Sequence, residues 1–281
     1  CKHYRGDNMA TLWVGSRKGL FRFDRAAAGW QQVGKPAFLA APVTFVLDDP
    51  CDGALYVALS HGHFGCKLHR SDDRGATWVE LPTPAFPKSD APDAPALELI
   101  WSIVPAGADR PGALWLGTIP GGLFSSTDRG ESWTLCSSLW NRPERGSWVG
   151  GGYDHAGIHS ILVDPRDSAH VTLAVSTGGV WITRDGGDSW ALGGQGLRAD
   201  YMPPGQQHEP LFQDVHLLTA PACDPDRMWC QHHCGIFVSD DGGMTFRESL
   251  DVAPSAFGFA VAAHPQNRDR AWFAPAVKDE C

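Results

Sequence analysis

The chain has 281 residues, of which 43% are hydrophobic and 10% aromatic, so it can fill a sizeable core. Its 23 lysines and arginines against 32 aspartates and glutamates give a formal charge of −9, and the sequence shows no basic stripe of the kind that a nucleic-acid-binding domain usually carries. The sequence has no stretch of about 18 apolar residues, as a membrane-spanning helix would need. We therefore expect neither a nucleic-acid partner nor a membrane.

The chain starts with a polar segment, residues 1–8, which we interpret as a tail or an expression remnant because Met9 looks like a natural start. No signal peptide is recognisable, and the eight cysteines show no regular spacing. Such cysteines are by default free thiols in a reducing compartment. The sequence therefore predicts a cytoplasmic protein.

From residue 11 onward, short apolar segments recur at regular spacing between turn residues. They are residues 12–15, 55–58, 114–117, 171–174, 228–231 and 271–274. Several are preceded by a second short strand that ends in a turn such as Asp49-Pro50 or Asp164-Pro165. Short strands separated by turns, without helical periodicity, predict an all-β protein.

One octapeptide pattern, Ser/Thr-x-Asp-x-Gly-x-Ser/Thr-aromatic, follows four of these strands. It occupies residues 71–78, 126–133, 183–190 and 239–246, and its closing aromatic residues lie 55 to 57 positions apart. We predict a tight hairpin in which the Asp carboxylate accepts hydrogen bonds from backbone N–H groups of its own turn. The glycine permits a positive φ, and the hydroxyl adds a local bond. We assign the pattern a folding role and no catalytic one.

These octapeptides resemble the repeats of the Asp-box, or BNR, family of sialidase-like propellers within the WD40/YVTN/BNR-like group. The resemblance implies a β-propeller of four-stranded blades, a single domain over residues 9–281. About six repeats are recognisable, but the first lacks its innermost strand and the last stops before its octapeptide. A propeller must close to remove its sheet edges. We expect a truncated seven-bladed ring, which a second chain could complete; closure by the terminal strands is the alternative.

Eight of the twelve histidines fall on one face of such a propeller, opposite the octapeptide turns. The long loops 81–97, 136–158 and 191–216 lie there too, and long loops on a rigid scaffold usually carry function. The resemblance places the active site of related enzymes on the same face. Our catalytic candidates are Glu98, Asp154, His155, His159, Asp214 and His216. Our ligand-binding candidates are His61, His63, Tyr153, His232, His233 and Lys278.

His159 and His216 begin strands at equivalent positions of consecutive repeats, nearest the predicted axis, and His232 follows in the second of those repeats. Imidazoles beside carboxylates can ligate a divalent metal or supply an acid/base pair. We name His159, His216 and His232 as candidate metal ligands, and a divalent metal is the one cofactor that the sequence suggests. The cysteines of residues 230–234 are interpreted as packing, because neighbours in a strand point apart.

Two classes of function stay open. The first is an enzyme, hydrolase-like and with or without a metal, that acts on a glycan or other small molecule in an axial pocket. Residues typical of sialidases, such as an Arg-Ile-Pro segment, are missing, and the xyloglucan-active relatives use paired aspartates from two propellers. The second is a non-catalytic scaffold for protein assembly. A pocket of convergent polar groups favours the first, and a uniform apolar or charged surface favours the second.

Overall fold

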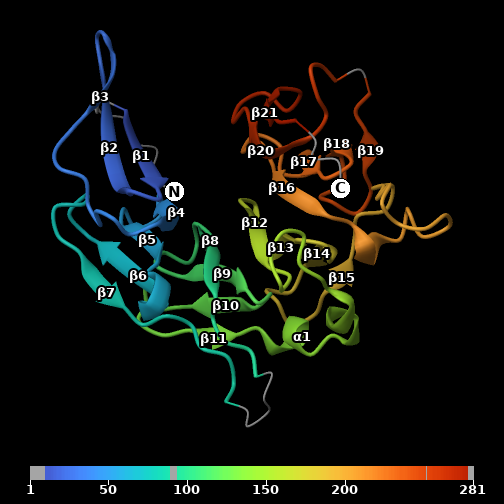
Figure 1. Ribbon diagram of the computed structural model, residues 1–281, viewed down its shortest axis with the longest axis horizontal. Helices are drawn as coiled ribbons and strands as arrows, with labels where there is room; N and C mark the ends of the chain where they lie inside the picture. Colours follow the sequence, from blue (N-terminus) through green and yellow to red (C-terminus); the bar gives the residue numbers. More distant parts are fainter. Residues whose placement is uncertain (1–9, 89–93, 251, 278–281) are drawn as a thin grey trace. The chain divides into compact units, whose positions relative to one another are not determined.

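The computed structural model describes residues 10–88, 94–250 and 252–277 (Figure 1). Over these residues it contains 21 strands and a single α-helix of four residues, which confirms the all-β prediction. None of the described helices is long and apolar enough to cross a membrane. None of the six cysteines in the described ranges forms a disulfide.

The chain divides into two compact units, and the first comprises residues 1–116 and 124–134. It contains a three-stranded sheet and a four-stranded sheet, each antiparallel and each built from consecutive strands. The first sheet holds β1 (Thr11–Ser16), β2 (Gly19–Ala26) and β3 (Gly29–Gln32); the second holds β4 (Val43–Asp48), β5 (Leu55–Ser60), β6 (Cys66–Ser71) and β7 (Val79–Leu81). A 3-10 turn, η1 (Gly62–Phe64), connects β5 to β6.

The third sheet lies where the division falls, since residues 117–123 group with the second unit. Its strands are β8 (Leu99–Pro105), β9 (Leu114–Ile119), β10 (Leu123–Ser126) and β11 (Thr134–Leu135). After it come α1 (Ser137–Trp140) and the 3-10 turn η2 (Pro143–Ser147).

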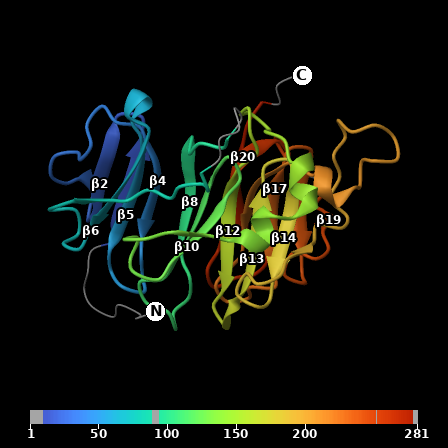
Figure 2. The same cartoon turned by 90° about the horizontal axis from the view of Figure 1, so that it is seen from below.

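The second unit comprises residues 117–123 and 135–281 (Figures 1 and 2). It holds two antiparallel four-stranded sheets and a two-stranded hairpin. The sheets are β12 (Ile158–Asp164), β13 (Asp167–Val175), β14 (Gly179–Thr183) and β15 (Ala191–Leu192), then β16 (Val215–Thr219), β17 (Met228–His232), β18 (Gly235–Ser239) and β19 (Arg247–Glu248). The hairpin is β20 (Gly258–Ala263) and β21 (Ala271–Pro275), and the 3-10 turn η3 (Pro210–Phe212) precedes β16.

The blade count differs from the sequence-based expectation. In the described part of the chain, five sheets have three or four strands and count as blades. The last repeat contributes a hairpin of two strands, so it is not a full blade. Four-stranded blades are therefore confirmed, whereas six repeats of a truncated seven-bladed ring are not supported.

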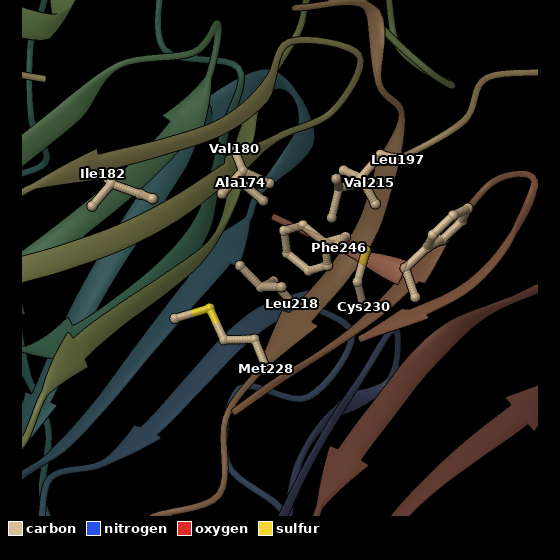
Figure 3. Close-up of a cluster of buried hydrophobic side chains, with 10 residues drawn as sticks. Ala174, Val180, Ile182, Leu197, Val215, Leu218, Met228, Cys230 and Phe246 are labelled. Carbon is tan, nitrogen blue, oxygen red and sulfur yellow. The ribbon is translucent and has the colours of Figure 1, made fainter. Parts of the chain in front are cut away.

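The core of the second unit lies between its two four-stranded sheets (Figure 3). Val180 and Ile182 of β14 pack there with Val215, Cys230 and Phe237 of β16–β18. Burying such a side chain contributes about 1.5–3 kcal/mol, so this interface fixes one sheet against the next. Cys230 is fully buried and burial raises the pKa of its thiol, in accord with the packing role expected of it.

The four octapeptide turns have the predicted hydrogen bonds. In the first, Asp73 accepts hydrogen bonds from the Thr77 N–H at 2.8 Å and the Thr77 hydroxyl at 2.6 Å. The Ser71 hydroxyl accepts from the N–H of Gly75, whose φ of +87° requires glycine. The same arrangement recurs at Asp128, Asp185 and Asp241. The carboxylates of these aspartates thus accept hydrogen bonds within their own turns and stabilise them.

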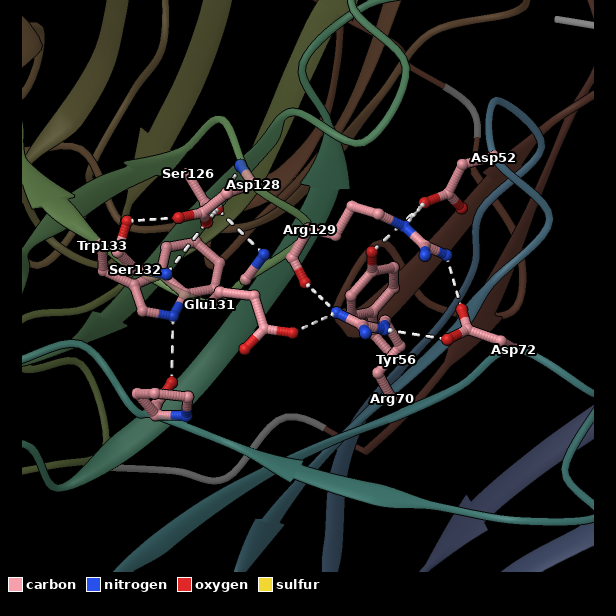
Figure 4. Close-up of polar contacts among 12 residues, drawn as sticks. Asp52, Tyr56, Arg70, Asp72, Ser126, Asp128, Arg129, Glu131, Ser132 and Trp133 are labelled. Atoms are coloured by element: carbon pink, nitrogen blue, oxygen red, sulfur yellow. Dashed lines mark hydrogen bonds and ion pairs between the residues drawn. The ribbon is translucent and has the colours of Figure 1, made fainter.

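Charged side chains connect neighbouring octapeptide turns within the first unit (Figure 4). Arg129 donates to the largely buried carboxylate of Asp52 at 2.8 Å and also pairs with Asp72. Arg70 donates to the Arg129 carbonyl at 3.0 Å and to Glu131 at 2.9 Å. These bonds join the second sheet to the third on the side of the octapeptides. We therefore assign this side of the unit a structural role.

Acid should weaken the octapeptide turns first. Hydrogen bonds from Thr77 and Ser189 lower the pKa values of Asp73 and Asp185 to about 2. Because the folded pKa lies below the unfolded one, this stabilisation is complete above about pH 4 and is lost as the pH falls towards 2. We expect the melting temperature to fall through that window, with a shallower fall in Asp185→Asn. Calorimetry at several pH values would contradict this if both proteins showed the same dependence.

Candidate functional site

Three predicted residues meet at one end of the sheet β16–β19. Asp214 directly precedes β16, His216 is the second residue of that strand, and His233 follows β17. Asp214 and His216 are two residues apart in extended chain, so their side chains share a face while Val215 points into the core. The backbone N–H of His233 donates to the Asp214 carbonyl at 3.0 Å, which brings the third side chain to the same place.

The side chains of this cluster, Asp214, His216 and His233, converge closely. Asp214 Oδ2 lies 3.8 Å from His216 Nε2 and 3.6 Å from His233 Nδ1. A carboxylate oxygen of Asp214 and one ring nitrogen from each histidine, the atoms that could ligate a metal, all lie within 4.8 Å of one another. The side chains are only 9%, 10% and 25% exposed, so the cluster is largely withdrawn from water.

The orientation of His216 is fixed on its far side. Its Nδ1 lies 2.7 Å from the carbonyl oxygen of Gly258, which can only accept, so Nδ1 carries a proton. In the neutral ring, the Nε2 lone pair therefore faces Asp214. The ring also stacks on Phe259, with centroids 4.7 Å apart and planes 15° apart. Phe257 lies edge-on to both His216 and His233, so β20 and its approach form an aromatic wall.

Electrostatics polarise the cluster. Burial raises the pKa of Asp214, but the hydrogen bond and charge of His216 outweigh burial and lower it. Burial lowers the pKa of His216, but Asp214 and the Gly258 carbonyl reverse this and raise it above its ordinary value. The arrangement therefore favours an ionised carboxylate beside an imidazole that gains a proton easily, which are the states needed for acid/base chemistry.

A glycine on the long loop 136–158 borders the carboxylate. A Cβ atom added to Gly151 would lie 3.1 Å from Asp214 Oδ1 and 3.2 Å from Oδ2. A side chain at this position would push the Asp214 carboxylate away by a few tenths of an ångström, whereas glycine leaves it in place. Tyr201 of the loop before β16 closes another side, with its ring 5.6 Å from that of His233.

The expected metal trio His159, His216 and His232 is not the group that the structure brings together. His232 pairs with Val215 across β16 and β17, so its side chain shares the core face and is completely buried. Its Nδ1 accepts a hydrogen bond from the Cys234 N–H, and burial lowers its pKa to about 3. His159 is also buried, with Nδ1 2.8 Å from Ser160 Oγ and a pKa lowered by burial to about 4.

The remaining candidates lie elsewhere. Tyr153, Asp154 and His155 are exposed on the loop 136–158. His61, His63 and Glu98 belong to the first unit, where His61 borders an open cavity of about 390 Å³ lined also by Phe38 and Phe64. Lys278 lies outside the described residues.

Sequence reasoning missed several residues around the cluster. The loop aromatics and glycines are too common to single out Tyr201 or Gly151 in advance. Phe257 and Phe259 lie more than 40 positions after His216 and come from the next repeat. His216 was singled out because it lies at the start of the first strand of its repeat. Phe259 lies at the equivalent position in β20, so the same pattern could have identified it.

Comparison with curated proteins finds partial relatives, while no protein-family profile matches the chain. The chain is 31% identical over 132 residues to the oligoxyloglucan-reducing end-specific xyloglucanase of Emericella nidulans. It is 30% identical over 135 residues to a probable enzyme of the same name from Neosartorya fischeri. Each match covers 46% of this chain and 15% of the relative. The chain is thus similar to a small part of much longer proteins.

Solved structures agree on the architecture. The GH74 enzyme of Niastella koreensis superposes with a TM-score of 0.61 and 15% identity over 93% of this chain and 38% of its own. The GH74 xyloglucanase of Xanthomonas campestris gives a TM-score of 0.54 and 16% identity over 95% of this chain and 49% of its own. The fold is that of a β-propeller. At these identities the likeness concerns the fold, so function has to be argued from the site.

Proposed function

We propose that this chain is a glycan-binding, glycoside hydrolase-like propeller of the Asp-box type, with its ligand site at Asp214, His216 and His233. The partial identity to two xyloglucanases is the observation that carries the proposal. The similar folds of GH74 enzymes support it. Oligosaccharides of the xyloglucan type are accordingly the first ligands to test.

The chemistry of the cluster suits a sugar. An ionised Asp214 accepts a proton or hydroxyl hydrogen bonds, and His216 in its protonated form donates to a glycosidic or hydroxyl oxygen. Phe259, 62% exposed, and Tyr201, 46% exposed, offer faces against which a sugar ring can pack. Binding and orientation of a polyhydroxylated ligand follow from these groups.

Hydrolysis of a glycosidic bond usually takes two carboxyl groups, about 5–5.5 Å or 6.5–9.5 Å apart. The cluster supplies one, Asp214, so the second role falls to an imidazole or to another acid. Asp154 lies in the same unit, on the loop that contains Gly151, and is our first candidate for it. Dependence on a divalent metal would be a third route, with a metal-bound water in place of the second carboxylate.

The test is binding and turnover of xyloglucan oligosaccharides by tag-free protein, measured by calorimetry and by analysis of the products. We expect Asp214→Asn to reduce turnover by about 100-fold or more, the scale of one acid/base group. Asp188→Asn, an exposed change of the same kind on an octapeptide turn, is the control. Binding without turnover would leave a glycan-recognition module. Absence of binding would overturn the proposal and favour a protein-assembly scaffold.

A further inference from the structure

We propose that Asp214, His216 and His233 bind one divalent transition-metal ion of the zinc class. This inference goes beyond the glycan proposal and would stand if no glycan were a ligand. Two imidazoles and one carboxylate form a donor set that suits zinc and its neighbours, whereas calcium and magnesium prefer oxygen alone.

The separations fit a metal without rebuilding of the site. In a tetrahedral zinc centre with bonds of about 2.0–2.1 Å, neighbouring donor atoms lie about 3.3 Å apart. Asp214 Oδ2 already lies 3.6 Å from His233 Nδ1 and 3.8 Å from His216 Nε2. A contraction of a few tenths of an ångström would bring each histidine nitrogen to the coordination separation from Asp214, and the donor atoms of all three residues lie within 4.8 Å of one another.

The surroundings orient the donors as the outer partners of a metal site do. The bond from His216 Nδ1 to the Gly258 carbonyl fixes the ring and directs the other nitrogen towards Asp214. A histidine ligand in a metal site typically donates its second N–H in this way to a carbonyl or carboxylate. The backbone bond from His233 to Asp214 ties the remaining two ligands to each other.

Charge balance points the same way. Among residues 10–88, 94–250 and 252–277, the ion-pair partners of the Asp214 carboxylate are His216 and His233, and no lysine or arginine pairs with it. The buried carboxylate is compensated by a proton on a neighbouring imidazole or by a bound cation, and a cation held by both histidines would take the place of that proton.

Three protein ligands leave one coordination position for water or a ligand, as in catalytic rather than structural zinc sites. Gly151 presents backbone without a side chain against the carboxylate, so no side chain of that residue covers the cluster. The fourth position is thus the place where a substrate oxygen would meet the metal.

Titration of the metal-free chain with zinc, followed by calorimetry, tests the proposal. We expect one equivalent to bind, with affinity reduced at least 100-fold in Asp214→Asn and in His233→Ala. His63→Ala, which removes an exposed imidazole from the first unit, is the matched control and should bind as the parent does. Circular dichroism checks that each variant is folded.

A cobalt(II) spectrum of the parent chain tests the proposal without relying on folded variants, and it distinguishes binding at these residues from binding at cysteine. Cobalt(II) in the parent chain should give the visible absorption of a four- or five-coordinate nitrogen and oxygen site, without a thiolate charge-transfer band. A thiolate band, a spectrum of octahedral hydrated cobalt, or zinc affinity unchanged in both ligand variants would overturn the proposal.

Discussion

Replacement of Trp181 by alanine should lower the free energy of unfolding of the second unit by about 3–5 kcal/mol, the usual cost of removing a large buried aromatic side chain. Trp181 lies in the middle of β14 and is 0% exposed. Its indole N–H donates to the Gly178 carbonyl at 2.9 Å, and its ring meets that of Trp148 edge-on at 5.8 Å. The substitution removes these contacts and leaves a cavity that a rigid sheet can fill only in part.

Urea denaturation followed by circular dichroism measures this loss. Trp30→Ala serves as the matched control, because Trp30 is 45% exposed on β3, and its loss should cost less than about 1 kcal/mol. Equal losses in the two variants would contradict the burial on which the packing of the second unit rests.

Substitution of Gly179 by alanine should destabilise the fold and disturb the candidate site together. Gly179 begins β14 with a φ of +79°, and a Cβ atom there would lie 2.3 Å from the carbonyl oxygen of Pro210 in η3. Its N–H donates to the carbonyl of Gln213, the residue before Asp214. The added methyl group must therefore displace the segment that positions the carboxylate.

A glycine of matching backbone conformation provides the control. Gly186 has a φ of +73°, and no atom lies within 4 Å of the position that a Cβ would take. Gly186→Ala should therefore lower the free energy of unfolding only by the cost of placing alanine in the left-handed conformation, about 1–2 kcal/mol. We expect Gly179→Ala to cost about 2 kcal/mol more and to weaken zinc binding at least tenfold. Identical denaturation midpoints for the two variants would show that η3 does not pack as described.

The repeated octapeptides allowed the all-β fold to be predicted from the sequence. The octapeptides specify their own turns through Asp73 and its three equivalents, because those bonds are local and need no knowledge of tertiary contacts. The number of blades depends on where strand pairing stops. The apolar patterns at residues 257–261 and 271–273 indicated an incomplete last repeat, and the described chain forms a two-stranded hairpin there.

The residues of the candidate cluster were among those singled out from the sequence. Asp214, His216 and His233 were all candidates, but the metal trio was drawn from histidines at strand starts and included His159 and His232. Strand register decides between adjacent histidines, and pairing with Val215 turns His232 into the core while His233 reaches Asp214. A sequence without its register cannot separate these two. The packing of Phe259 against His216 likewise depends on how consecutive sheets face each other.

The central claim is that Asp214, His216 and His233 form one ligand-binding centre, and anomalous X-ray diffraction at the zinc edge tests it most directly. Crystals of the whole chain with one equivalent of zinc should show a single strong peak about 2.0–2.2 Å from a carboxylate oxygen of Asp214 and from nitrogens of both histidines. A peak on cysteine side chains, or ordered zinc elsewhere with none at these three residues, would contradict the account.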